Sequence, residues 1–280
     1  MNTVLITGGT GKTGRRIAEK LTQQGVGVRL ASRSALPINN YESIRFIWGD
    51  ETTYDAALKD VKAIYLLAPA NVAEPLDVMK PFIDYAVKKG VKRFVLLSAS
   101  SLPKGGPMMG AVHAYLEETV PEWAALRPTW FMQNFSEQQH LETILSEGAI
   151  YSATDNGRVP FIDADDIASV AAVALTRKEP LNRDVIMTGP SAITYDDVAS
   201  TISRVINKPV EHIKLTEGQL RQRFIVSGME LVYANVLSAM DTAISLGSEE
   251  NCSNEVKNLT GKDPISFLDF AEQASMNWAR

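Results

Sequence analysis

The stretch of sequence that decides the fold is residues 4–14, VLITGGTGKTG. Its apolar start, residues 4–7, predicts a β-strand, and residues 13–24 carry apolar side chains at helical spacing. Gly8, Gly11 and Gly14 have the spacing G-x-x-G-x-x-G where the strand turns into the helix, and they allow a sharp turn that brings backbone N–H groups to the surface. A strand, a glycine turn and a helix in this order are typical of the first unit of a parallel α/β sheet.

The rest of the first half continues the same alternation of strands and helices. Apolar strands separated by helices indicate parallel strands covered on both faces, and right-handed crossovers then give a Rossmann-type doubly wound sheet. The sequence predicts further strands at 28–32, 44–48, 63–68, 93–98 and 124–127, and helices at 54–59, 75–89 and 111–119.

The second half has a looser pattern. We expect helices at 135–147, 165–176 and 194–206, a returning strand at 185–188, and a mostly helical stretch over the last 70 or so residues. The sequence contains no Pro/Gly/Ser linker. It therefore predicts a nucleotide-binding domain over residues 1–150, with a smaller, mostly helical C-terminal region over 151–280 packed on it.

Composition excludes several classes of protein. The net charge of −5 and the absence of a lysine/arginine block argue against nucleic acid as a main partner. A single cysteine excludes an internal disulfide framework, and three histidines without zinc spacing make a metal site unexpected. We find neither a signal-peptide pattern nor a run of apolar residues that would cross a membrane, and we expect a cytoplasmic protein.

The glycine turn has the features of a phosphate site. Backbone N–H groups of the turn and the positive end of the following helix dipole suit a pyrophosphate. The spacing excludes a P-loop, and the alternative is an ordinary glycine-rich turn. The predicted cofactor contacts in this segment are Gly8, Thr10, Gly11, Lys12 and Thr13.

The end of the second predicted strand indicates which dinucleotide is bound. Folds that bind NAD place an acidic residue there for the ribose 2′-hydroxyl, whereas this chain has Ser32 and Arg33 and no acid before Glu42. An arginine can hold a 2′-phosphate with two hydrogen bonds. NADP(H) is therefore the predicted cofactor, and the alternative for Arg33 is a solvated surface residue.

Further motifs accompany the glycine turn over about residues 1–210. They are Gly49-Asp50, LLAP at 66–69, LLSAS at 96–100, LRPTWFMQNF at 126–135, VPFIDADDIA at 159–168 and TGP at 188–190. With these motifs the chain resembles an atypical short-chain dehydrogenase/reductase of the NmrA-like group. This resemblance implies that Asp50, Ala68, Pro69, Ser98 and Ala99 also line the cofactor, and that the C-terminal region binds the substrate.

Within the group, TGGTGKT at 7–13 and VHAYL at 112–116 are most similar to the ergot-alkaloid branch. That branch, the festuclavine and agroclavine dehydrogenases, implies NADPH-dependent reduction of an imine. Bacterial relatives without an assigned substrate are an alternative, and neighbouring branches of the group reduce quinones.

The acid–base pair of ordinary short-chain dehydrogenases is missing from the sequence. Their Tyr-x-x-x-Lys lets the tyrosine pass a proton to a carbonyl oxygen. Here Tyr115 is followed four residues later by Thr119, and the Tyr85–Lys89 pair falls in an earlier helix. An iminium or another activated acceptor takes hydride without a protein proton donor. The alternatives are a reductase of a small apolar imine, enone or quinone, and a non-catalytic NADP(H) sensor.

The remaining candidates concern the substrate side. His113 is a candidate for proton handling or substrate orientation, and a packing histidine is the alternative. Ser100, Trp130 and Phe131 are predicted substrate contacts, although both aromatic residues also suit a core. The expected partner is a small-molecule substrate, with a homodimer or a regulatory protein as further possibilities.

Overall fold

The computed structural model describes residues 3–34, 41–70, 72 and 74–279, and it divides into two compact units. The first, which we call the sheet unit, comprises Met1–Pro128, Ala164–Met187 and Glu255–Lys262. The second unit comprises Thr129–Asp163, Thr188–Asn254 and Asp263–Arg280. The sequence placed the boundary at residue 150, whereas the chain leaves the sheet unit at residue 128 and later returns to it twice.

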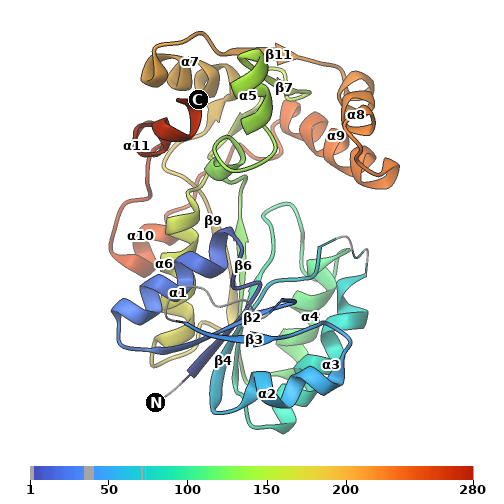
Figure 1. The fold of residues 1–280 in the computed structure, drawn as a ribbon, viewed down its shortest axis with the longest axis vertical. Helices are drawn as coiled ribbons and strands as arrows, with labels where there is room; N and C mark the ends of the chain where they lie inside the picture. Colours follow the sequence, from blue (N-terminus) through green and yellow to red (C-terminus); the bar gives the residue numbers. More distant parts are fainter. Residues whose placement is uncertain (1–2, 35–40, 71, 73, 280) are drawn as a thin grey trace. The chain divides into compact units, whose positions relative to one another are not determined.

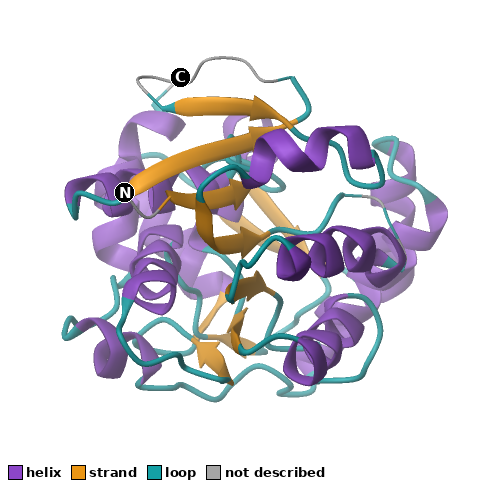
Figure 2. Ribbon diagram, turned by 90° about the horizontal axis from the view of Figure 1, so that it is seen from below, coloured by secondary structure: helices purple, strands orange, loops and turns teal. Residues whose placement is uncertain are grey.

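The sheet unit is built on seven parallel strands in the order β3-β2-β1-β4-β5-β6-β9 (Figures 1 and 2). The order reverses between β1 and β4, which makes this the Rossmann-type doubly wound sheet that the sequence predicts. Strand β9 explains the return of the chain, because it pairs in parallel with β6 and completes the edge of the sheet. The strands are β1 (Thr3–Thr7), β2 (Gly27–Ser32), β3 (Glu42–Arg45), β4 (Val61–Leu66), β5 (Arg93–Leu97), β6 (Glu122–Pro128) and β9 (Arg183–Met187).

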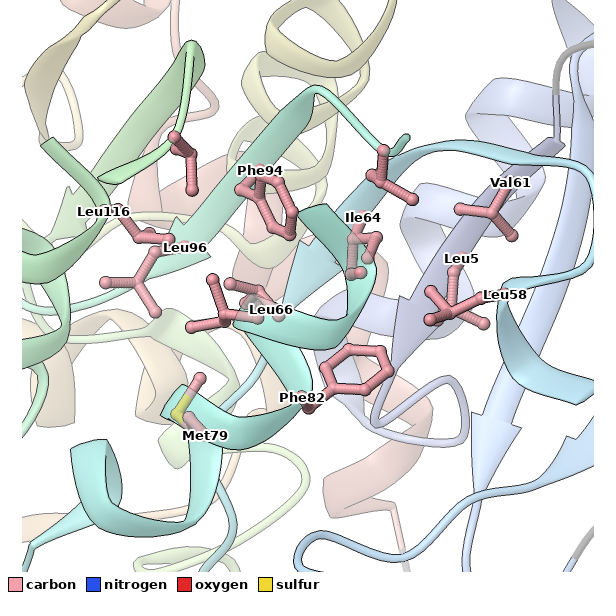
Figure 3. Packing of buried hydrophobic residues seen from close by; sticks show 14 of the residues in the cluster. Leu5, Leu58, Val61, Ile64, Leu66, Met79, Phe82, Phe94, Leu96 and Leu116 are labelled. Atoms are coloured by element: carbon pink, nitrogen blue, oxygen red, sulfur yellow. The ribbon is translucent and has the colours of Figure 1, made fainter. Parts of the chain in front are cut away.

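Helices cover both faces of this sheet (Figure 1). One face carries α2 (Tyr54–Leu58), α3 (Pro75–Lys88) and α4 (Met109–Thr119), and the other carries α1 (Lys12–Gln23), α6 (Ala164–Thr176) and α10 (Glu255–Thr260). On the first face, side chains of alternate strand positions such as Leu5, Ile64 and Phe94 pack against Phe82 and Met79 of α3 (Figure 3). A short 3-10 helix, Glu51–Thr53, precedes α2.

The second unit contains two small sheets, the parallel pair β7/β11 and the antiparallel pair β8/β10, which the sequence did not predict. Its α7 begins with a capping box formed by Thr194 and Asp197. The elements are a 3-10 helix (Met132–Asn134), α5 (Leu141–Glu147), β7 (Ala149–Ser152), β8 (Arg158–Val159), β10 (Ile193–Thr194), α7 (Tyr195–Ile206), β11 (Glu211–Lys214), α8 (Glu217–Val226), α9 (Leu231–Ser245), α11 (Phe267–Ala274) and a 3-10 helix (Ser275–Trp278).

The prediction of a single helix over residues 135–147 is wrong. Only Leu141–Glu147 is α-helical, because Gln139 has a positive φ of 29° and the chain turns around the buried His140. The His140 ring stacks on Phe135, 4.9 Å between centroids. The chain therefore turns to bury this aromatic pair and does not form the continuous helix that the apolar spacing suggests.

The last residues of the chain belong to the core of the second unit. Trp278 is buried among aromatic side chains, and its indole N–H donates to the carbonyl oxygen of Phe135 at 2.8 Å. The C-terminal segment, for which the sequence offered no role, therefore helps to close this core. Among the described residues, no helix has both the length and the apolar character needed to cross a membrane.

Candidate nucleotide site and its surroundings

The glycine turn between β1 and α1 is packed too closely for larger residues. Gly8 has φ +64°, and a Cβ at this position would lie 2.3 Å from Leu67 Cδ2. A Cβ on Gly14, in the first turn of α1, would lie 2.4 Å from the carbonyl oxygen of Gly8. The Gly11 N–H donates to the same Gly8 oxygen at 2.9 Å. The glycines thus bring the start of α1 directly against the turn, as the predicted spacing requires.

Buried hydroxyl groups link both ends of this turn to β4. Thr7 Oγ1 donates to the carbonyl oxygen of Tyr65 at 3.0 Å and accepts from the N–H of Leu67 at 2.7 Å, which ties β1 to the end of β4. The Tyr65 hydroxyl donates to Thr13 Oγ1 at 3.0 Å. Of the predicted contacts, Thr10 is exposed, whereas the Thr13 side chain is buried and faces the sheet. Thr13 can therefore offer a ligand its backbone rather than its hydroxyl.

The N-terminus of α1 suits an anion. Gly11 is the N-cap residue and supplies no side-chain cap, and the first turn carries no acidic residue. Lys12 lies in this turn, where a cation is unfavourable for the helix dipole unless a negative group is bound nearby. Further along the helix, Arg16 pairs with Asp165 at 3.0 Å. Asp165 is an acidic residue in the first turn of α6.

Basic residues lie at the end of β2, and the nearest acidic residue is already in an ion pair. Arg33 is exposed directly after β2. Glu42, the first acidic residue after β2, pairs with Arg29 at 2.8 Å within the sheet. Arg45 ends β3 and lies in register with Ser32, so that a second exposed arginine stands at the same edge. The strand predicted over 44–48 has Arg45 near its start, whereas β3 runs from Glu42 to Arg45 and has Arg45 at its carboxyl end.

The other predicted cofactor residues also follow strands of the sheet unit. The Asp50 carboxylate caps the 3-10 helix Glu51–Thr53 by accepting from the Thr52 N–H at 3.2 Å. Ala68 and Pro69 follow β4 and are half-buried. Because the carboxyl ends of parallel strands share one edge, these positions and those after β5 lie on the edge that carries the glycine turn.

The segment after β5 contains a buried hydroxyl group without a partner. Ser98 is 6% exposed, and its Oγ makes no hydrogen bond within the described part of the chain. Its N–H donates to the carbonyl oxygen of Leu126 at 2.7 Å, and the N–H of Ser100 donates to that of Pro128 at 2.9 Å. Ser98 and its neighbour Ala99 are thus held by β6, while the buried Ser98 Oγ has no hydrogen-bond partner among the described residues.

His113 lies on the face of α4 that packs against the sheet. It is 2% exposed, and its ring centroid lies 5.2 Å from that of Trp123. Burial lowers the pKa of the imidazole, which favours its neutral form at pH 7. Its Nδ1 has no hydrogen-bond partner within residues 3–34, 41–70, 72 and 74–279. This environment favours packing over exchange of a proton with a substrate.

Two tyrosines lie next to a lysine side chain, and both tyrosines are on helices that cover the sheet, α3 and α4. Lys89 approaches the Tyr85 ring and pairs with Asp55 at 2.7 Å. Lys80 Nζ lies 2.9 Å from the Tyr115 hydroxyl, which donates to Asp84. Sequence spacing could not show this second pair, because its members come from α3 and α4. Lys80 is exposed and is also bonded to Asp84 at 2.8 Å.

In the second unit, two of the motifs quoted from the sequence pair with each other. The Ile162 N–H donates to the carbonyl oxygen of Trp130, and the Met132 N–H donates to that of Ile162, both at 2.9 Å. Gln133 Nε2 donates to Asp163 Oδ2 at 3.0 Å in a buried contact. Trp130 and Phe131 are half-buried. The two motifs therefore form one structural element, with both aromatic residues on it.

Comparison with known proteins agrees with the sequence resemblance and extends it. The model of the NmrA-like family matches residues 1–267, well beyond the first 210 residues. The uncharacterized oxidoreductase YesF of Bacillus subtilis is 40% identical over 277 residues, 99% of this chain and 96% of that protein. Agroclavine dehydrogenase of Claviceps purpurea is 41% identical over 286 residues, 99% of this chain and 98% of that protein.

A solved structure shares the fold at lower identity. It is the NADPH-dependent quinone oxidoreductase QOR2 of Escherichia coli in complex with NADPH, with a TM-score of 0.82 and 21% identity over 96% of this chain and 99% of that one. The family match across nearly the whole chain is the decisive result, and by it the protein belongs to the NmrA-like family.

Proposed function

We propose that this protein is an NADPH-dependent oxidoreductase that reduces a small, apolar iminium, enone or quinone. The observation that carries the cofactor assignment is the glycine turn, where Gly14 packs on Gly8 and α1 begins without a side-chain cap or an acidic residue. The agroclavine and festuclavine dehydrogenases among its relatives, at 37–41% identity, support the class of reaction.

In this proposal the pyrophosphate binds the backbone N–H groups of residues 8–13 and the N-terminus of α1. Arg33 binds the 2′-phosphate together with Lys12, and Arg45 adds positive charge at the same edge. Because Glu42 is paired with Arg29, it does not compete as a partner for a ribose 2′-hydroxyl. Asp50 is assigned to the adenosine side, and Ala68, Pro69, Ser98 and Ala99 to the nicotinamide side.

The cofactor supplies hydride when it is bound, and the protein has to position the acceptor and exclude water. An iminium carbon that takes hydride gives a neutral amine, so that step balances without a proton, whereas the anion formed from an enone or a quinone takes its proton from solvent. This fits the environments of His113, which is buried, and of Tyr85 and Tyr115, which lie on the outer helices. We assign Ser100, Trp130 and Phe131 to the substrate, and the C-terminal region to substrate binding.

The test measures NADPH oxidation in the near ultraviolet with iminium, enone and quinone acceptors, alongside calorimetric titration with NADPH. Turnover with an iminium acceptor supports the proposal in full. Tight NADPH binding without turnover on any acceptor supports instead a sensor of the cofactor. Absence of NADPH binding contradicts both functions.

A further inference from the structure

Arg127, near the carboxyl end of β6, holds the segment that follows β5. Its guanidinium donates through Nη2 to the carbonyl oxygen of Ser100 at 2.7 Å and through Nε to that of Ala99 at 3.3 Å. Its Nη1 pairs with Asp184 of β9 at 2.6 Å. The side chain is 13% exposed. One arginine therefore links three neighbouring strands at the edge that carries the glycine turn.

These contacts add to the backbone hydrogen bonds of the segment, in which the Ser100 N–H donates to Pro128 and the Leu102 N–H donates to the Ala99 carbonyl oxygen at 3.1 Å. Two consecutive carbonyl oxygens on one rigid guanidinium determine the orientation of both peptide planes. Those planes carry the chain directly after Ser98, whose buried Oγ has no partner within the described residues. The segment that joins β5 to α4 is strained at its other end, because Met108, the residue before α4, has φ +55°. Arg127 therefore constrains the backbone immediately after Ser98.

We propose that Arg127 is a positioning residue that orients Ser98 and Ser100 toward the bound cofactor and substrate. This inference rests on the proposed function. The planar fork of the guanidinium is required, since a lysine ammonium in its place acts as a point charge and cannot hold both carbonyl oxygens and Asp184 in fixed directions. Arg127 touches no reacting atom, so its effect falls on the rate of hydride transfer more than on cofactor affinity.

The opposite edge of the same sheet provides a matched control. Arg93, at the start of β5, pairs with Glu122 at 2.7 Å and donates to the carbonyl oxygens of Arg177 at 2.6 Å and Leu175 at 3.3 Å. Its side chain is 12% exposed, close to the value for Arg127. Arg93 also donates to the carbonyl oxygen of Lys178 at 3.5 Å, so it has similar chemistry, a carboxylate and backbone carbonyls, at the edge away from the glycine turn.

The experiment compares Arg127→Gln, Arg127→Lys and Arg93→Gln with the wild type, using the acceptor that the wild type reduces. We expect kcat of Arg127→Gln to fall tenfold or more, roughly the cost of misplacing a reacting group by less than 1 Å, with the Kd for NADPH changed less than about threefold. Arg127→Lys should recover only a small part of this loss. Arg93→Gln should keep kcat within about twofold at equal folded fraction.

A second measurement needs no turnover. Hydrogen–deuterium exchange of the backbone amides at 99–104 should accelerate in Arg127→Gln and in Asp184→Asn, and stay unchanged in Arg93→Gln. Equal losses of kcat in Arg127→Gln and Arg93→Gln, or unchanged exchange at 99–104, overturn the inference. A wild type that neither binds NADPH nor turns over contradicts the proposed function instead, and the exchange measurement still decides the role of Arg127.

Discussion

Replacement of Gly14 by alanine tests the packing of α1 on the glycine turn. The new Cβ would lie 2.4 Å from the Gly8 carbonyl oxygen and 2.8 Å from Gly9 Cα, and both neighbours are backbone atoms. An ordinary contact begins at 3.4 Å, so the helix and the turn must separate by about 1 Å. Overpacking of this kind costs about 1–3 kcal/mol, and the higher helix propensity of alanine offsets about 1 kcal/mol.

The same shift moves the backbone N–H groups of the turn away from the phosphates. A hydrogen bond to a charged group contributes about 1.5–3 kcal/mol, so loss of one weakens NADPH binding roughly ten- to a hundredfold. Calorimetric titration of the variant with NADPH measures this loss, and thermal unfolding measures its stability.

Gly25→Ala is the control, because it has a similar cost in stability and lies away from the phosphates. Gly25 follows α1 before β2 begins, has φ +73° and would place its Cβ in open space. An alanine there costs about 1–2 kcal/mol of backbone strain. The reasoning is refuted if Gly14→Ala binds NADPH like the wild type, or if Gly25→Ala weakens binding equally.

Two further predictions concern the second unit and pH. Burial raises the pKa of Asp241 to about 7 from 3.8, so the contribution of this carboxyl group to stability is fully present below pH 3.8 and is lost as the pH rises through about 7. Asp241→Asn keeps an acceptor for the Ala153 N–H and should recover roughly 4 kcal/mol at pH 8 in urea unfolding; no gain at pH 8 contradicts this. Burial and, to a lesser extent, His212 lower the pKa of His140 to about 3 from 6.5, so this contribution is present above pH 6.5 and is lost as the pH falls toward 3. His140→Phe should move the acid-unfolding midpoint to lower pH, and a midpoint that stays in place refutes the assignment.

The sheet unit was largely predictable from the sequence, because its signals are local. An apolar run such as Ala63–Leu66 is a buried strand wherever helices cover both faces, and Gly8 and Gly14 mark a turn that larger residues cannot adopt. The second unit was less predictable. The apolar spacing of residues 135–147 resembles a helix, and only the burial of His140 against Phe135 shows why the chain turns instead.

The candidate site was predictable where it depends on one segment and not where it depends on several. Arg33 is visible from its place after β2, whereas Arg45 requires the register between β2 and β3. The contacts of Arg127 with two carbonyl oxygens and Asp184 join three strands that are far apart in the chain. No spacing in a single sequence encodes such a cluster.

The central claim is that the edge of the sheet beside the glycine turn binds NADP(H) through its phosphates. Its most direct test is calorimetric titration of the wild type and of the double variant Lys12→Gln/Arg33→Gln with NADPH and with NADH. The account predicts that the wild type prefers NADPH and that the double variant loses roughly tenfold or more in affinity for NADPH, at about 1.5–3 kcal/mol per contact, with little change for NADH. Equal affinity of the wild type for both cofactors, or equal loss for both in the variant, would contradict it.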